Sequence, residues 1–450
     1  MSKRARRLAG LTVVAIFGAV VIFRVLSLRD PGAVPAEVQP RTSSPSPNVA
    51  LELEGRGSAQ EALLQLCPSG GRAKDQQQPP VRSSSEVPPA IAETQDQVEQ
   101  VRELEFLHPV EAEPLSREAL TEKLRNFAEQ ELPRGPLRRR GLAWETIGAI
   151  PEGTNLRDAH LDLLGSQVVG FYIPETEELF FLGSNDPSPL ERYILAHELT
   201  HALDDQHFDL DRIDALSGKC QDDAVAAATA VVEGSAEAST VLVVQRFFSV
   251  SDQLELGSEA VATSQSTGDA PPFLVELAIW PYIEGLEFVS ELQSRDGFEG
   301  VNAALRSPPI TSEQVLHPEK YPSDEPQETD IPDLGPRLGG NWSDIDVQDV
   351  GEQWLSTLLD LRLPPDEAEA AAAGWDGGIY RAWSDGEKVA VVLTTAWDSS
   401  GDAAEFAEAM RGWFEPGQAA VASSHGDRAL VFFASDQPTL DALVRAGSVN

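Results

Sequence analysis

Leu195-Ala-His-Glu-Leu-Thr-His-Ala-Leu203 contains the pattern H-E-x-x-H, formed by His197, Glu198 and His201. Apolar residues recur at helical spacing through Pro189–Phe208, which predicts one helix there. On a helix the two histidines lie one turn apart, so both imidazoles leave the same face and can bind one Zn²⁺. The glutamate lies beside them, where it can take a proton from a metal-bound water. The pattern therefore predicts a zinc site; a chance match on an ordinary amphipathic helix has a probability on the order of 1%.

Glu233 is the first candidate for the third ligand that a catalytic zinc site needs beside its open fourth position. It lies in a run from about 222 to 248 that is rich in Ala and Val, which predicts a long, mostly buried helix. A carboxylate in an apolar helix is unfavourable unless it is paired or bound to a metal. Glu237 follows one turn later, where it can accept a hydrogen bond from the second nitrogen of a ligand histidine. A carboxylate satisfied by other protein groups is the alternative.

His207 is the alternative third ligand. It follows His201 at the spacing of H-E-x-x-H-x-x-G-x-x-H enzymes, in which the glycine lets the chain turn back toward the metal. Here Asp204 occupies the glycine position. If the helix continues through Asp204, His207 lies about 240° around the helix from His201 and faces away from the metal. Glu233 is favoured for this reason.

Two apolar runs, Val168–Ile173 and Leu179–Leu182, precede the H-E-x-x-H helix and are separated by Pro174-Glu-Thr-Glu-Glu178. This arrangement predicts a β-hairpin. The edge strand of a metallopeptidase sheet can hold an extended substrate by backbone hydrogen bonds. A hairpin that only covers the helix is a compatible alternative.

Two downstream residues, His317 and Tyr321, are candidates for donors that stabilise the oxyanion formed when water adds to a carbonyl. A proline follows His317, which favours an extended backbone outside a helix. A structural role for both residues is the favoured interpretation. Tyr282 and Tyr193 rank lower as donors.

The motif at 197–201, followed downstream by a helix with Glu233 and an acidic residue one turn later, resembles the gluzincin class of zinc peptidases. The resemblance implies two histidines and a glutamate on zinc, with the motif glutamate as general base. Carried over, it assigns His197, His201 and Glu233 to zinc, Glu198 to proton transfer, and Glu237 to the support of a ligand. The Asn-Glu signature of that class is absent, and Val232-Glu233-Gly234 takes its place.

A closer similarity is to exported bacterial zincin-like proteins of uncharacterised activity. Three segments carry it: Ala196–Phe208, Val232–Gly234 and Glu313–Tyr321. The similarity covers about half of the chain. It implies a zincin-like fold and a metal more securely than it implies a substrate.

The charge balance excludes one class of partner. Lys and Arg number 34 against 73 Asp and Glu, which gives a formal net charge of −39 in 450 residues. Nucleic-acid binding needs a basic footprint, so nucleic acid is not expected as a partner. A hydrophobic content of 41% still permits large cores.

The N-terminus departs from the acidic composition. Four cations, Lys3, Arg4, Arg6 and Arg7, precede an apolar run at 8–28. This run has about the 20 residues that a helix needs to cross a bilayer. The cations predict a cytoplasmic N-terminus, with the bulk of the chain outside the cytoplasm. A cleaved signal peptide is the alternative to this membrane anchor.

The predicted fold class is α+β: a mostly helical zincin-like domain with a small sheet, followed by a small α+β module. Pro-, Ser- and Gln-rich sequence predicts a disordered stalk after the anchor, with one short helix at 59–66 and no packed core. An exported location would permit a disulfide between Cys67 and Cys220, or two free thiols. The predicted segments are a basic tail (1–7), a membrane anchor (8–28), a disordered linker (29–94), the zincin-like domain (95–325), an acidic Pro/Gly linker (326–345) and the α+β module (346–450).

The leading hypothesis is a membrane-anchored, extracytoplasmic zinc metallopeptidase that acts on a protein or peptide and uses no organic cofactor. The alternative is a catalytically inactive zincin-like ectodomain that binds a partner or an envelope component. A zinc hydrolase of a non-peptide amide is a third, weaker hypothesis. The sequence does not identify the substrate.

Overall fold

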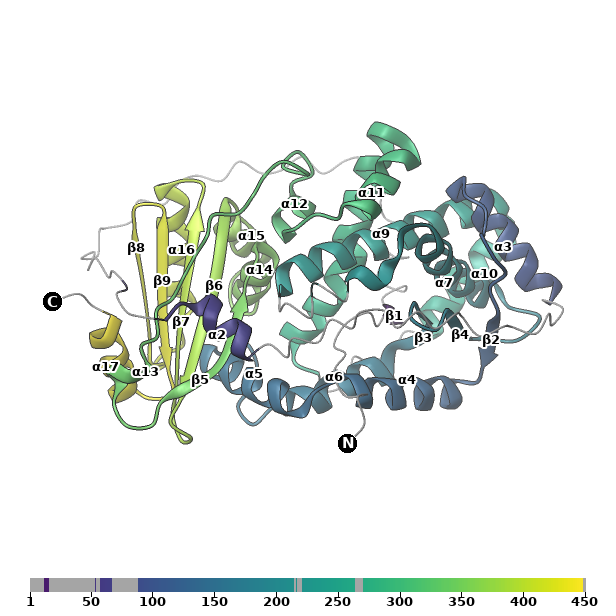
Figure 1. Cartoon of the computed structure of the whole chain (residues 1–450). Helices are drawn as coiled ribbons and strands as arrows, with labels where there is room; N and C mark the ends of the chain where they lie inside the picture. Colours follow the sequence, from purple (N-terminus) through teal and green to yellow (C-terminus); the bar gives the residue numbers. More distant parts are fainter. Residues whose placement is uncertain are drawn as a thin grey trace.

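The computed structural model describes residues 12–15, 53, 57–66, 88–213, 216, 221–263 and 270–447. The fold is mixed α+β, as predicted: helices predominate, and two small sheets lie at different places in the molecule. In Figure 1 the helices that carry the H-E-x-x-H motif lie on the right and the larger sheet lies on the left. Cys67 and Cys220, the predicted disulfide partners, lie outside the described residues.

The smaller sheet has the strand order β1-β3-β4-β2. Its centre is the predicted hairpin, formed by β3 (Val168–Ile173) and β4 (Glu178–Leu182) in antiparallel pairing. Strand β2 (Ala112–Leu115) pairs in parallel with β4. All six residues of β3 are buried, because helices and neighbouring strands cover both of its faces.

Strand β1 (Thr12–Ala15) pairs antiparallel with β3. These four residues belong to the segment 8–28, for which the sequence predicts a membrane-spanning helix; the rest of that segment lies outside the described residues. The prediction of a helix is wrong for these four residues in this structure. An apolar, β-branched segment can satisfy its backbone groups at an open sheet edge as well as in a helix. The membrane anchor itself stays a prediction.

Three long helices form the centre of the helical half. Helix α7 (Pro189–Phe208) has the bounds that the sequence predicts, and it begins with a capping box in which Ser188 Oγ accepts from Glu191 N. It packs against α9 (Asp222–Phe247), which runs beside α11 (Pro272–Arg306). Among the described helices, α9 alone is long and apolar enough to cross a membrane, and 78% of its most apolar window is buried within the fold.

Helices α9 and α11 approach each other closely at two glycines. A Cβ added at Gly234 would lie 2.1 Å from the carbonyl oxygen of Gly285, and one added at Gly285 would lie 2.0 Å from the carbonyl oxygen of Ala230. Only glycine leaves room for this backbone contact. The contact fixes how α11 lies along the part of α9 that carries Glu233.

Shorter helices surround this centre. They join the long helices to the two sheets, and α4, α5 and α6 run along the lower edge of the molecule in Figure 1. The members are α3 (Pro89–Arg102), α4 (Arg117–Glu131), α5 (Arg134–Ile147), α6 (Leu156–Gln167), the 3₁₀ helix η1 (Leu210–Ile213), α10 (Val250–Thr263) and α12 (Ser312–Leu316).

The larger sheet has the strand order β5-β6-β7-β9-β8, with every neighbouring pair antiparallel. Helices cover both faces, so adjacent residues such as Val391 and Val392 are both buried although they point to opposite faces. The strands are β5 (Ser343–Asp349), β6 (Trp375–Ser384), β7 (Val389–Trp397), β8 (Ala420–His425) and β9 (Arg428–Ala434). The helices of this half are α13 (Gly335–Leu338), α14 (Glu352–Asp360), α15 (Pro365–Ala372), α16 (Ser400–Trp413) and α17 (Gln437–Gly447).

Helix α2 (Ala59–Leu66) has the bounds of the short helix that the sequence predicts in the stalk. The prediction that this segment has no packed core is wrong at α2, because Ala59, Ala62 and Leu63 are buried against the larger sheet. These residues lie at helical spacing on one face. A helix of this length is unstable in isolation and gains its stability from that contact.

A continuous apolar core joins the two halves. Trp144 of α5 meets Phe273 of α11 at a centroid distance of 5.2 Å, and Phe273 meets Trp354 of α14 at 5.4 Å. Trp354 in turn lies beside Tyr380 of β6. The larger sheet is thus packed directly on the helical half, and residues 326–345 contribute buried Ile331 and Leu334 to its other face.

Candidate metal centre

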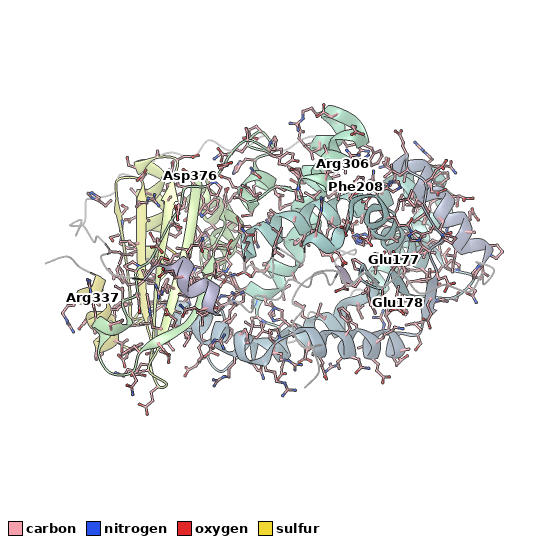
Figure 2. The ribbon with its side chains drawn as sticks, viewed as in Figure 1. Glu177, Glu178, Phe208, Arg306, Arg337 and Asp376 are labelled. Atoms are coloured by element: carbon pink, nitrogen blue, oxygen red, sulfur yellow. The ribbon has the colours of Figure 1, made fainter. Side chains whose placement is uncertain are left out.

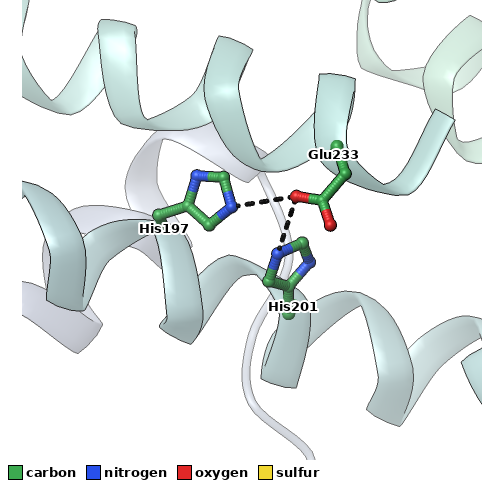
Figure 3. Close-up of side chains that lie close together, drawn as sticks. All are labelled: His197, His201 and Glu233. Carbon is green, nitrogen blue, oxygen red and sulfur yellow. Dashed lines mark hydrogen bonds and ion pairs between the residues drawn. The ribbon is translucent and has the colours of Figure 1, made fainter. Parts of the chain in front are cut away.

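His197, His201 and Glu233 converge on one point between α7 and α9 (Figure 3). His197 Nε2 lies 3.2 Å from Glu233 Oε2, and His201 Nε2 lies 3.4 Å from the same oxygen. The three side chains are no more than 2% exposed. The H-E-x-x-H spacing places both rings on one face of α7, and the buried stretch of α9 brings the carboxylate to them.

These distances fit a tetrahedral metal. Bonds of 2.0–2.1 Å from zinc to nitrogen or oxygen place two ligand atoms about 3.3 Å apart. The two distances from Glu233 Oε2 fall on either side of that value. Two imidazoles and one carboxylate are also a donor set that zinc takes in catalytic sites. The three residues therefore fit a divalent cation, and the geometry by itself does not define which one.

Glu237 lies behind the ligands, as the sequence predicts. Its Oε1 lies 3.3 Å from His197 Nδ1, the nitrogen that faces away from Glu233. Tyr193, one turn before His197 on α7, donates a hydrogen bond of 2.7 Å to Glu237 Oε2. A carboxylate in this place fixes the ring orientation and the tautomer of a ligand histidine. Tyr193 in turn fixes the carboxylate.

Glu198 lies beside the centre with an unusual environment. Its side chain is fully buried, and neither carboxylate oxygen has a hydrogen-bond partner among the described residues. Gly170 of β3 packs against it: a Cβ at this glycine would lie 2.7 Å from Glu198 Oε1. Burial raises the pKa of Glu198 well above its usual range. A buried carboxyl with no protein partner is available to a water or a substrate group.

The charges of the centre are strongly coupled. Burial acts to raise the pKa of Glu233, but the charges and contacts of His201 and His197 outweigh it and lower the pKa to about 2. Burial likewise acts to lower the pKa of His197, and its contacts with Glu233 and Glu237 raise it to about 10. Burial lowers the pKa of His201. The cluster thus holds a carboxylate that seeks positive charge, which a bound cation supplies.

Tyr282 of α11 also belongs to the centre. Its ring stacks on that of His197 at a centroid distance of 6.3 Å and an interplanar angle of 26°. Burial, followed by the charges of Glu233, Glu198 and Glu237, raises the pKa of Tyr282 well above its usual range. The structure thus brings Tyr193 and Tyr282 to the centre, although the sequence ranks them below His317 and Tyr321.

His317 and Tyr321, the preferred oxyanion donors, have other partners. His317 Nε2 lies 3.0 Å from Glu352 Oε1 at the start of α14, and the Tyr321 hydroxyl donates to Ser307 O at 2.7 Å. No described contact joins either side chain to the three ligands. The segment 315–321 instead connects α12 with the larger sheet, which agrees with the structural role that the sequence favours.

His207 lies outside the ligand group. Helix α7 continues through Asp204, as the argument from helix geometry requires, and His207 Nε2 lies 2.8 Å from the carbonyl oxygen of Glu105. The group that the described residues form is His197, His201 and Glu233. His207 as third ligand is therefore wrong for this structure.

Comparisons with known proteins give little guidance. A family model described as Domain of unknown function (DUF8575) matches residues 340–446, which are the larger sheet and its helices. No curated protein matches. A solved structure from Chloroflexus aurantiacus, of a proposed hydrolase with a novel fold, is 15% identical, and the match covers 58% of this chain and 95% of that chain. Its TM-score of 0.34 is too low to define a shared fold.

Proposed function

We propose that this chain is a zinc metallopeptidase of the gluzincin type. One observation carries the proposal: Glu233 reaches the two motif histidines at 3.2 and 3.4 Å, while Glu198 stands beside them with both carboxylate oxygens unpartnered among the described residues. A site built only for stability would pair these oxygens. A site built for hydrolysis leaves the general base free to meet water.

When bound, zinc would polarise the substrate carbonyl and lower the pKa of water. His197, His201 and Glu233 would hold the ion, and Glu237 would keep the His197 ring in place through Nδ1. Glu198 would accept the proton of the attacking water at a carboxylate oxygen and deliver it to the leaving amine. Burial of the site excludes bulk water, which strengthens each of these electrostatic contacts.

The β3 edge supports an extended peptide as the substrate. In the structure β1 pairs antiparallel with this edge, with Val14 opposite Gly170. Gly170 is the residue that packs against Glu198. A peptide that paired with β3 in place of β1 would bring its backbone next to the proposed base, since main-chain hydrogen bonds fix the register of an added strand.

The completeness of the burial favours a second candidate. His197, Glu198, His201 and Glu233 are all no more than 1% exposed. A zincin-like protein that keeps its metal for stability and binds a partner elsewhere would have such a closed centre. Turnover in this second candidate is absent, whereas zinc binding persists.

Replacement of Glu198 by Gln separates the two candidates. The variant is expected to bind one zinc per chain, as the wild type does, and to lose peptide hydrolysis by at least about 100-fold. Zinc is measured by metal analysis after gel filtration, and turnover with a library of quenched fluorescent peptides. Hydrolysis by the variant at the wild-type rate contradicts the peptidase; zinc without turnover in both proteins favours the binding protein.

A further inference from the structure

A second buried polar group lies directly behind the ligands. Arg102, the last residue of α3, and Asp204 of α7 are 0% and 1% exposed. Arg102 Nε donates to Asp204 Oδ1 at 3.1 Å, and Arg102 Nη2 donates to Asn302 Oδ1 of α11 at 3.0 Å. The guanidinium lies 4.8 Å from the centre of the Phe298 ring, also on α11. One arginine thus contacts two of the three central helices.

Asp204 also contacts the third helix. Its second oxygen, Oδ2, accepts a hydrogen bond of 2.6 Å from Ser235 Oγ of α9. Asp204 follows His201 by three residues, so it lies one turn further along the same side of α7. Ser235 follows Glu233 by two residues on α9. This hydrogen bond therefore joins the two ligand-bearing helices about one turn from the point where His201 meets Glu233.

The charges make this arrangement demanding. The centre already holds the carboxylates of Glu233, Glu237 and Glu198, each no more than 1% exposed. A further buried carboxylate without a counter-charge would be strongly unfavourable. Arg102 supplies that counter-charge and leaves Oδ2 of Asp204 free to accept from Ser235. The arginine thereby permits an acidic bridge between the helices at a place that is already acidic.

We propose that Arg102, Asp204 and Ser235 are positioning residues that hold α7 and α9 at the separation at which Glu233 and His201 bind one metal ion. The inference rests on the proposed function, because it assumes that this group binds zinc. None of the three touches the metal. They act through the distance between the helices, which a tetrahedral site tolerates only within a few tenths of an ångström.

Ser235→Ala is the sharpest test, because it removes one hydroxyl and improves helix propensity. Ser239→Ala is a matched control: Ser239 lies one turn later on α9 and is equally buried, but its hydroxyl donates to the carbonyl oxygen of Ser235 within the same helix at 2.7 Å. Zinc dissociation constants are measured by competition with a chromophoric chelator on the full chain. The melting temperature of the metal-free protein is recorded in parallel.

We expect Ser235→Ala to weaken zinc binding by about tenfold, as the loss of an outer partner does in other zinc sites, and Ser239→Ala to stay within about twofold. The metal-free melting temperatures of the two variants should agree, since each loses one buried hydroxyl. Wild-type affinity in Ser235→Ala, or an equal loss in Ser239→Ala, overturns the inference. Failure of the wild-type chain to bind zinc instead overturns the proposed function, so the two failures are distinguishable.

Discussion

The molecule contains two buried clusters of charged side chains that differ in how well they are satisfied. At the junction with the larger sheet, Arg140 of α5 donates to both oxygens of Asp222 at 3.1 Å and to Asp346 at 3.1 Å. Tyr380 donates to Asp346, and Trp144 Nε1 donates to the Tyr380 hydroxyl at 3.2 Å. Every side-chain donor and acceptor of this cluster that is fully buried has a partner. We call it the Arg140 cluster.

The metal centre is built from similar residue types and leaves groups unpaired. Both oxygens of Glu198 and Nδ1 of His201 have no hydrogen-bond partner among the described residues. Buried polar groups without partners are rare and call for an explanation such as an ion or a water. The difference teaches that burial of charge alone does not mark a functional site. What marks it is charge that the protein itself leaves incompletely matched.

The metal centre should depend on Glu233 more than on any other change considered in the chain. Glu233→Ala is expected to weaken zinc binding by at least about 100-fold, more than the loss of a residue behind the ligands. His207→Ala is the control, because its ring contacts the carbonyl oxygen of Glu105 instead of the ligands. Zinc content is measured for both variants and the wild type side by side. Loss of zinc in His207→Ala alone would reverse the choice of third ligand.

The Arg140 cluster should show the opposite pattern, a loss of stability without a loss of metal affinity. Arg140→Met leaves two carboxylates, Asp222 and Asp346, without their counter-charge and is expected to lower the free energy of unfolding by about 2 kcal/mol. Arg295→Met, at an exposed ion pair with Asp296, is the control and should change it by less than about 0.5 kcal/mol. Urea unfolding of the metal-free protein measures both. A weaker zinc site in folded Arg140→Met would erase the contrast between the clusters.

Gly170→Ala tests whether the space around Glu198 is functional. The added methyl would lie 2.7 Å from Glu198 Oε1, so the carboxylate must move. Peptide hydrolysis should fall about tenfold, in line with the misplacement of a general base, while zinc stays bound. Gly412→Ala is the control, because a methyl there meets no atom within 4 Å. Equal turnover in the two variants would show that the position of Glu198 is not critical.

A pH series tests the acidic border of the Arg140 cluster. Burial, with the charges of Glu352 and Asp222 acting in the same direction, raises the pKa of Asp223 to about 6 in the fold. A raised pKa means that the folded state favours the protonated acid, so this contribution to stability is complete below about pH 4 and is lost as the pH rises to about 6. Asp223→Asn, which stays neutral, should therefore gain about 1 kcal/mol relative to the wild type between pH 4.5 and 7.

The control for this series is Asp436→Asn. Hydrogen bonds from Thr439 and Lys388 lower the pKa of Asp436 to about 2, so it stays ionised throughout the measured range. The difference between that variant and the wild type should not change between pH 4.5 and 7. All melting curves are recorded with a chelator, so that zinc affinity does not enter. A flat difference for Asp223→Asn would show that its carboxyl is not protonated in the fold.

Local periodicity determined the elements that carry the ligands. Helix α7, its Ser188 cap, the β3–β4 hairpin and helix α9 follow from spacings of two or three to four residues, which the backbone geometry alone defines. The choice of Glu233 over His207 also follows from helix geometry, because it needs only the angle per residue. These features depend on neighbours in the sequence, and the sequence therefore contains them.

Other features depend on which elements meet, and no spacing announces that. Arg102 reaches Asp204 across about a hundred residues, Gly170 packs on Glu198 from another element, and Tyr282 reaches His197 from α11. His317 and Tyr321 illustrate the converse, since their residue types suit a catalytic site while the fold gives them other partners. The sequence by itself thus determined the metal ligands and the helices that bear them. The tertiary structure decided what surrounds them, because the crossing of helices is set by the packing of side chains distant in the chain.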